Sequence, residues 1–171
     1  IELDADTGDI KKRIVYHEAT GKPQREINYY EGSKEKDITI YNENGLPLEK
    51  TQYDLENSLP QVKTTYYLNG NPKEVVEYKD GRESQRTKYY DNNNKQAQIQ
   101  YDEHGNPTTK TEYDNLEREI ASVTYYNNKK AWVTSTKFTE FILKFDDEMK
   151  SKSKKVLLVD KHAVMTGERS S

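Results

Sequence analysis

A β-branched residue followed two positions later by tyrosine recurs along most of the chain. Tyrosines of successive pairs are 11 to 13 residues apart. A spacing of two places both members of a pair on the same face of an extended strand. The pattern therefore predicts a tandem array of strand-turn units, each with a strand of about seven residues and a turn of about five. The ten pairs are Ile14/Tyr16, Ile27/Tyr29, Thr39/Tyr41, Thr51/Tyr53, Thr64/Tyr66, Val76/Tyr78, Thr87/Tyr89, Ile99/Tyr101, Thr111/Tyr113 and Val123/Tyr125.

Turn-forming residues separate these pairs. Asn-Gly and Asp-Gly steps readily supply the positive φ of tight hairpins, and they occur at Asn44-Gly45, Asn69-Gly70 and Asp80-Gly81. Three turns lack glycine (near Asn57-Ser58, Asn92–Asn94 and Asp114-Asn115), but Asn and Asp are the next most tolerant of left-handed backbone. No window of this region has apolar residues at helical spacing. We therefore expect a mainly β fold, an elongated antiparallel β-meander of about ten short strands in a single-layer sheet.

The composition agrees with a thin fold. Only 32% of the 171 residues are hydrophobic, 14 of these are tyrosines, and 33% are charged. A conventional two-layer core requires more Leu, Ile, Val and Phe. Cross-strand pairs, Tyr with Tyr, Thr or Val and Lys or Arg with Glu, must then stabilise the sheet, each by roughly 0.2–1 kcal/mol.

The amino-acid sequence of the repeat is similar to that of known repeat families. Tyr67–Gly81, read as Tyr-x-Asn-Gly-x-Pro-Lys-Glu-x-x-x-Tyr-Lys-Asp-Gly, resembles the bacterial MORN-type variant repeat. Tyr101–Pro107 resembles YD-type repeats and the Tyr/Gly-rich repeats of phytoplasma proteins. These resemblances imply extended β-hairpin arrays that bind proteins or membranes and catalyse no reaction.

The last 45 residues differ in composition from the array. All three Phe, the Trp and both Met follow Tyr126, so we place a boundary between an array over 1–126 and a tail over 127–171. The spacing of Phe138, Phe141, Ile142, Phe145 and Met149 predicts one face of an amphipathic helix, with Thr134 or Ser135 as its N-cap. Val156–Val159 predicts a short strand that ends at Asp160. The helix is expected either to cap the last edge of the sheet or to dock into a partner's groove.

The tail resembles a fragment of a transposase domain. Lys130–Ser135, Phe138, Phe141, Phe145-Asp146 and Lys155–Asp160 are similar in order and spacing to the central stretch of pogo/Tigger/jerky-type DDE domains. In that family the Asp after the apolar strand is a catalytic metal ligand, which makes Asp160 a vestigial family position. A two-metal site requires several convergent carboxylates, and the array replaces the region where an earlier one would lie. We therefore expect no catalytic residue, no metal ligand and no cofactor.

Charge divides along the same boundary. Residues 1–126 carry 17 Lys and Arg against 24 Asp and Glu, whereas residues 127–171 carry 10 against 6. An acidic array is unsuited to nucleic acid, whose phosphates require an excess of cations, although the basic tail keeps such an association open. His17, His104 and His162 are scattered and predict solvated surface rather than a zinc site. No apolar run reaches the length of a transmembrane helix, and the absence of cysteine excludes disulfides.

These observations predict a non-enzymatic scaffold that binds a protein partner. Tyrosine presents a large contact area at low side-chain entropy cost, which suits a binding surface. The resemblance of the repeats to bacterial families favours an effector that is secreted or lies in a host cytoplasm. Two alternatives stay open, a transposase-derived nuclear protein with residual nucleic-acid binding and a carbohydrate-binding module. The candidate binding face comprises Tyr29, Tyr41, Tyr53, Tyr66, Tyr78, Tyr89, Tyr101 and Tyr113.

Overall fold

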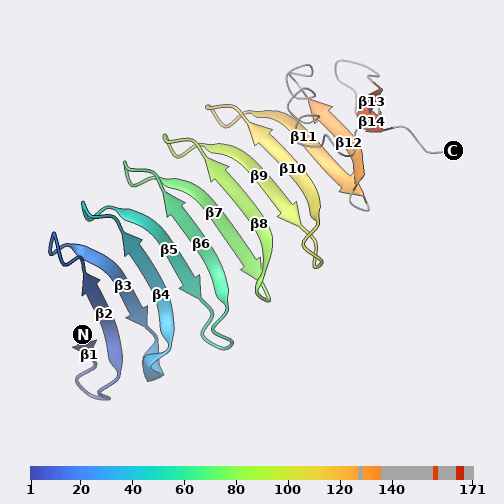
Figure 1. Cartoon of the computed structure of the whole chain (residues 1–171). Coiled ribbons are helices and arrows are strands. Elements are labelled where there is room, and N and C mark those ends of the chain that lie inside the picture. The colour runs from blue at the N-terminus through green and yellow to red at the C-terminus, as the bar shows by residue number, and fades with distance from the viewer. Residues whose placement is uncertain (127–128, 136–155, 158–164, 168–171) are drawn as a thin grey trace. The chain divides into compact units, whose positions relative to one another are not determined.

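The computed structural model of this chain describes residues 1–126, 129–135, 156–157 and 165–167. It divides into two units, Ile1–Asn93 and Asn94–Ser171. In each unit the strands form one antiparallel sheet, and consecutive strands are neighbours as far as β12 (Figure 1). The predicted mainly β meander is therefore confirmed.

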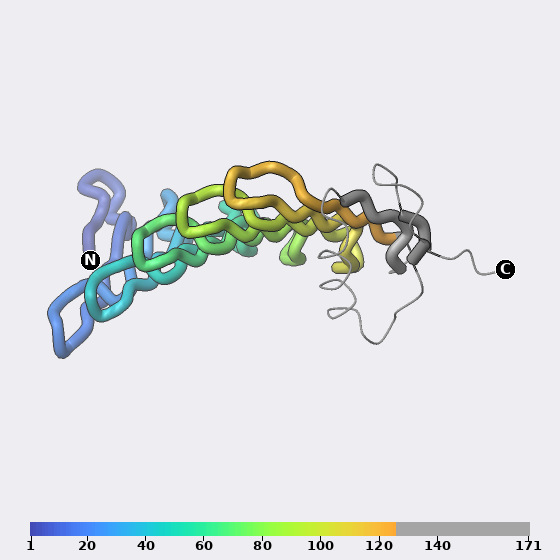
Figure 2. Tube along the Cα trace, turned by 90° about the horizontal axis from the view of Figure 1, so that it is seen from above, coloured from blue at the N-terminus to red at the C-terminus, as the bar shows by residue number. Residues whose placement is uncertain are grey.

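Unit 1 contains eight strands and one short 3-10 turn. Its strands pair in chain order from β1 to β8, and Figure 2 follows the chain from hairpin to hairpin. All of unit 1 is described, and none of its elements covers either face of its sheet. The elements are β1 (Glu2–Leu3), β2 (Ile10–Tyr16), β3 (Pro23–Tyr29), η1 (Glu31–Ser33), β4 (Glu35–Tyr41), β5 (Pro47–Tyr53), β6 (Pro60–Tyr66), β7 (Pro72–Lys79) and β8 (Arg82–Tyr89).

Unit 2 continues the same strand pattern and then departs from it. Its order is β9-β10-β11-β12-β14-β13, so β14 lies between β12 and β13. Strand β12 pairs with β11 over Ala121 to Tyr126, although the sequence pattern assigned residues 129–135 to the tail. The strands are β9 (Lys95–Tyr101), β10 (Pro107–Tyr113), β11 (Glu119–Tyr126), β12 (Lys129–Ser135), β13 (Val156–Leu157) and β14 (Met165–Gly167).

Tyrosine marks the strand ends, as the repeat predicts. Strands β2 to β6 and β8 to β10 all end at a tyrosine of the ten pairs, and β7 ends one residue after Tyr78. A tyrosine that ends a strand leaves the next residues free to turn. The turn residues with positive φ include the predicted Gly45 and Gly70.

Turns without glycine still place one residue in the left-handed region. Asn93, as expected of Asn, has φ 70°, but Ser58 and Glu117 each have φ 58°. Neither residue type favours this region. We did not predict these two positions, because the turn geometry imposes a conformation that the residue itself disfavours.

Every hairpin from β2/β3 onward in unit 1 contains a bulge at the same place. The register shifts by one residue beside the tyrosine at or next to the end of the first strand. For example, Ile40 pairs with Glu49 but Tyr41 pairs with Pro47, which leaves Leu48 as the extra residue. Bulges increase the local right-handed twist. Because a bulge recurs in each of these hairpins, we expect the sheet to be strongly twisted.

The five prolines share one structural role. Each begins a strand and lies opposite the tyrosine that ends the strand before it. The first residue of a strand tolerates proline because no ladder hydrogen bond is lost there. The register partners are Tyr16/Pro23, Tyr41/Pro47, Tyr53/Pro60, Tyr66/Pro72 and Tyr101/Pro107.

The buried core consists of only a few residues. In unit 1 the buried apolar side chains are Ile27, Ile38 and Val76, and among residues 94–125 of unit 2 they are Ala121 and Val123. Asp37, Thr39 and Thr87 are buried as well, on the face of unit 1 opposite these apolar residues. A single layer leaves no interior for larger apolar groups, so polar and aromatic contacts carry much of the stability.

Candidate binding surface

The strand register divides unit 1 into two faces. One register row comprises Glu26, Thr39, Lys50, Thr64, Val75 and Thr87, and we call its side the threonine face. The neighbouring row comprises Ile27, Ile38, Thr51, Lys63, Val76 and Arg86, and we call its side the isoleucine face.

The strand-end tyrosines alternate between these faces. Thr39, two residues before Tyr41, pairs with Lys50, which lies three residues before Tyr53. This odd offset recurs in each hairpin, so consecutive tyrosines point to opposite sides. The threonine face holds Tyr16, Tyr41, Tyr66 and Tyr89, and the isoleucine face holds Tyr29, Tyr53 and Tyr78.

The predicted binding residues therefore form rows on two sides rather than one face. In unit 2 the same offset separates Tyr101 from Tyr113, because Ile99 pairs with Lys110. All eight candidates are half-buried. Tyr16, which was not among them, is 53% exposed and is more accessible than any of these eight. Half-burial is compatible with both a packing role and a contact surface.

Tyr41 and Tyr78 have similar electrostatic surroundings on opposite faces. Burial raises the pKa of Tyr41, and the Glu26 carboxylate raises it further. Glu26 in turn forms an ion pair with Lys12 at 2.9 Å. Burial likewise raises the pKa of Tyr78, whose neighbour Lys63 forms an ion pair with Glu49 at 2.9 Å. Each ring thus lies beside a cross-strand Lys–Glu pair, so aromatic and charged contacts are available side by side.

The second tyrosines of two doublets each link their own turn to the next turn at the same end of the strands. Tyr30 and Tyr67 lie just past the ends of β3 and β6. The Tyr30 hydroxyl donates to the carbonyl of Tyr53 at 3.2 Å, and the Tyr67 hydroxyl donates to that of Tyr89 at 2.7 Å. The ammonium groups of Lys36 and Lys73 lie 5.7 and 5.9 Å from the centres of these two rings. Neighbouring hairpins are therefore held together at their ends.

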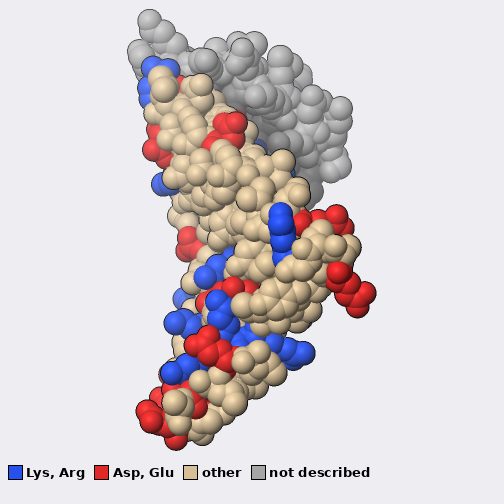
Figure 3. Space-filling model, turned by 90° about the vertical axis from the view of Figure 1, so that its left-hand side faces the viewer, with Lys and Arg blue, Asp and Glu red and all other residues tan. Residues whose placement is uncertain are grey.

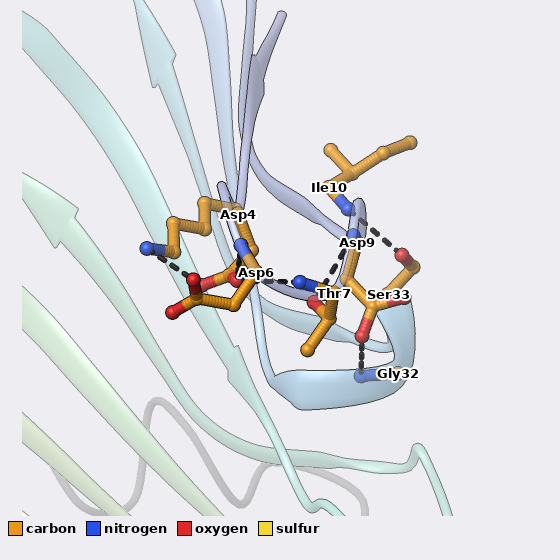
Figure 4. A network of polar contacts seen from close by, with 8 residues as sticks. Asp4, Asp6, Thr7, Asp9, Ile10, Gly32 and Ser33 are labelled. Carbon is orange, nitrogen blue, oxygen red and sulfur yellow. Dashed lines mark hydrogen bonds and ion pairs between the residues drawn. The ribbon is translucent and has the colours of Figure 1, made fainter.

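Polar contacts also tie the first turn of the chain to η1 (Figure 4). The Gly32 amide donates to Asp9 Oδ2 at 3.0 Å, and the Ile10 amide donates to Ser33 Oγ at 3.0 Å. Within the first turn, the Asp4 carboxylate accepts the amides of Asp6 and Thr7, both at 2.9 Å. These bonds fix the edge of the sheet at β1 and β2.

An Asp or Asn directly after the strand-end tyrosine organises several turns. The Oδ1 atom of Asp54 accepts the amides of Glu56 and Asn57, and that of Asn42 accepts the amides of Asn44 and Leu46. These bonds favour the charged form of the Asp, so the amides of Asn57 and Glu56 lower the pKa of Asp54. The same contact explains the recurring Tyr-Asp and Tyr-Asn steps of the sequence.

Four ion pairs between neighbouring strands of unit 1 follow one geometric rule. In each, the carboxylate lies two residues before the direct register partner of the cation. A twisted sheet brings one diagonal closer than the other, and diagonal Cα atoms are about 7–8 Å apart. Figure 3 accordingly shows both signs of charge intermixed over the side that it presents. The pairs are Lys12–Glu26, Lys50–Asp37, Lys63–Glu49 and Arg86–Glu74.

Arg13 and Arg25 occupy this same diagonal without a carboxylate. Arg13 pairs with Ile27, and Arg25 lies two residues before Ile27. Both side chains are exposed on the isoleucine face. Neither residue was among the predicted site residues. The signal in the sequence is their separation of 12, one repeat period, but its meaning depends on the register.

Other predicted residues are placed as follows. His104 is exposed in the turn after β9, with Nε2 3.6 Å from the Glu103 carboxylate, and His17 is half-buried after β2. Across the described part of the chain, no three His, Asp or Glu side chains converge as a metal site would require. Phe138, Phe141, Ile142, Phe145, Met149, Asp160 and His162 lie outside the described residues. Within the ranges that the structure describes, no helix has the length and apolar character needed to span a membrane.

Comparison with known proteins gives distant structural similarity. No protein-family model and no curated protein matches the sequence. A structure of accessory secretory proteins 1, 2 and 3 of Streptococcus pneumoniae aligns with 66% of this chain and 20% of that chain, at 13% identity and a TM-score of 0.43. A GtfA/B complex bound to UDP and GlcNAc aligns with 77% and 26%, at 14% identity and 0.45. TarM aligns with 51% and 17%, at 12% identity and 0.39. The chain spans about a quarter or less of these chains, and no family follows from them.

Proposed function

We propose that this chain is a non-enzymatic scaffold that binds a protein partner on the faces of its repeat sheet. The observation that carries the proposal is the pair of tyrosine rows on the two faces of unit 1, neither of which another element of that unit covers. Tyrosine is enriched at protein interfaces because it joins an apolar ring to a polar hydroxyl. An open single layer supplies an extended surface of this kind rather than a closed cavity.

The fastened hairpins support the proposal energetically. Turn-to-turn bonds such as Tyr67 to Tyr89 hold neighbouring strands at their ends. A contact surface that is already ordered loses less conformational entropy when a partner binds. The half-buried rings therefore present a prepared surface, while their buried parts stabilise the sheet.

Two surface variants test the proposal and serve as controls for each other. Tyr16→Ser removes a 53% exposed ring from the threonine face, and Ile40→Ser removes a 39% exposed side chain from the isoleucine face. The immobilised full-length chain and both variants are exposed to protein extracts of the source organism, after circular dichroism has verified the folding of each. Retained proteins are identified by mass spectrometry, then purified and titrated against the chain.

The expected result is a purified protein that binds the wild type and loses at least tenfold in affinity to one variant but not to the other. Such face-specific loss distinguishes a surface interaction from general adhesion. If every retained protein binds both variants as well as the wild type, the sheet faces are not the binding surface and the proposal fails.

A further inference from the structure

The charge pattern of the isoleucine face is incomplete at Arg13 and Arg25. Four other cations of unit 1 have a carboxylate on the close diagonal, at 2.9 to 3.4 Å from their nitrogen atoms. Arg13 has Arg25 in that position. Neither guanidinium forms an ion pair or hydrogen bond with any described residue.

The other like-charged diagonal pair of unit 1 has partners of opposite charge. Glu26 and Asp37 are also diagonal neighbours. Lys12 lies 2.9 Å from Glu26, Lys50 lies 3.4 Å from Asp37, and the Asn28 amide donates to both carboxylates. The chain therefore neutralises two adjacent carboxylates with its own residues, but leaves two adjacent arginines without counter-charge.

Apolar side chains flank the unpaired arginines. Arg25 has Val15 as its register partner on one side and Ile40 on the other, and these are 37% and 39% exposed. The buried Ile27 and Ile38 lie in the adjacent register row of the same face. Exposed apolar atoms next to a charge pair lower the local dielectric when a ligand covers them, which strengthens a charge interaction there.

We propose that Arg13 and Arg25 bind two carboxylates of an extended acidic segment of a partner protein, with Val15 and Ile40 contacting its apolar neighbours. The inference rests on the proposed protein-binding function and adds the site and the chemistry of the partner. Alternate residues of an extended chain are about 6.6–6.8 Å apart, close to the diagonal separation of about 7–8 Å between the two arginines. A Glu-x-Glu sequence thus presents one carboxylate to each guanidinium, and Arg binds carboxylates in a bidentate manner.

Nucleic acid is the less suitable polyanion for this site. The array from residue 1 to 126 carries 24 acidic against 17 basic residues, so beyond the arginine pair a long phosphate backbone would gain no net attraction from the array. A short acidic segment bounded by apolar residues needs only the local charge. An oligonucleotide therefore belongs in the experiment as a competing ligand.

The test is an NMR titration of the full-length chain, a method that detects weak binding. The probe is the capped peptide Val-Ser-Glu-Ser-Glu-Ser-Val, and its control has Gln in place of both Glu. A single-stranded oligothymidine is titrated in parallel. The expected result is that amide signals of β2 to β4 shift with the Glu peptide, and that the Gln peptide binds at least tenfold more weakly.

Charge swaps separate binding from folding. Arg13→Glu and Arg25→Glu each restore a cation–carboxylate diagonal, so each is expected to raise the midpoint of thermal unfolding and to abolish peptide binding. The double swap abolishes binding without the rise in the midpoint, because it places two carboxylates together. Lys79→Glu is the matched control, since it changes the same charge at an exposed residue outside the site and is expected to leave peptide binding unchanged.

The outcomes distinguish this inference from the proposed function. Equal binding of the Glu and Gln peptides, unchanged binding by both single swaps, or preference for the oligonucleotide would each overturn it. The proposed function survives that result if a protein still shows face-specific loss in the experiment with Tyr16→Ser and Ile40→Ser. Peptide binding without any such protein would instead leave the arginine site standing and reject the face-specific scaffold.

Discussion

The doublet Tyr66-Tyr67 offers an internal test of how the hairpins are fastened. The Tyr67 hydroxyl donates to the carbonyl of Tyr89 at 2.7 Å in a partly buried position. Tyr66 is also half-buried, but its hydroxyl has no hydrogen-bond partner among the described residues. Replacing each tyrosine with phenylalanine removes one oxygen and leaves the ring, and only Tyr67→Phe breaks a hydrogen bond.

The expected cost of Tyr67→Phe is about 1 kcal/mol in the free energy of unfolding. An intramolecular hydrogen bond contributes a net of about 0.5–1.5 kcal/mol, and this short, partly buried bond is assigned the middle of that range. The ring contact with Lys73, at 5.9 Å, persists in phenylalanine and does not add to the loss. For Tyr66→Phe we expect a change close to zero.

Urea unfolding of the full-length chain, followed by far-ultraviolet circular dichroism, measures the difference. With a slope of about 1–3 kcal/mol per M, Tyr67→Phe should lower the midpoint by roughly 0.3–1 M. The slope itself should stay the same in both variants. A decrease in Tyr66→Phe as large as that in Tyr67→Phe would refute the reasoning, because the ring surroundings and not the bond to Tyr89 would then account for the loss.

Four further variants test predictions about turns and titration. Ser58→Gly should stabilise the chain by up to about 1 kcal/mol in urea, since it relieves a φ of 58° at some cost in glycine entropy, and Gly70→Ala (φ +87°, open space at Cβ) should destabilise it by a similar amount. Backbone amides lower the pKa of Asp54, so its contribution to stability is complete above its unfolded pKa of about 3.9 and is lost as pH falls through the lower folded value. Asp54→Asn introduces the residue type that another turn has at Asn42. This variant should make the midpoint of thermal unfolding depend less on pH in the acid range. Burial raises the pKa of Tyr41, so stability is complete below its unfolded pKa of about 10 and is lost as pH rises through the raised folded value, and Tyr41→Phe should retain more stability in an alkaline melt series.

Local periodicity accounts for the part of the fold that the sequence could predict. A β-branched residue two positions before tyrosine specifies one face of a strand, and the following Asn or Asp specifies the turn, without reference to any distant residue. Strand β4, for example, ends at Tyr41 and turns at Asn42, as its own residues require. These are short-range preferences, and they recur in each period.

The register could not be predicted, and the arrangement of the candidate site depends on it. One bulge per hairpin makes the residue two before Tyr41 pair with the residue three before Tyr53, which places the side chains of Tyr41 and Tyr53 on opposite faces. The period alone does not reveal the bulge. For the same reason the sequence did not show that the Tyr30 and Tyr67 hydroxyls reach the next turn, or that Arg13 and Arg25 are diagonal neighbours.

The end of the array in the sequence also differs from the end of the sheet in the structure. The loss of tyrosine after Tyr126 suggested that the repeat ends there, yet β12 pairs with β11 through backbone hydrogen bonds. β-Branched residues favour strands, and β12 includes Val133 and Thr134 although it has no tyrosine. Composition therefore located the change in side-chain chemistry, whereas the sheet extended past it.

In a single-layer repeat sheet, a position that lacks one of the recurring stabilising contacts is informative. Such a sheet has almost no interior to stabilise it, so it depends on repeated small contributions from diagonal ion pairs, turn carboxylates and tyrosine contacts. A position that omits one of these contributions loses stability that no core replaces. Ser58 is an exception that the turn geometry explains, since its neighbours Asp54 and Asn57 complete the hydrogen bonds of that turn. Arg13 and Arg25 have no such compensation within the described chain, and a local cost without compensation is characteristic of residues kept for binding. The arginine pair is therefore the place on this sheet where stability and function are expected to separate.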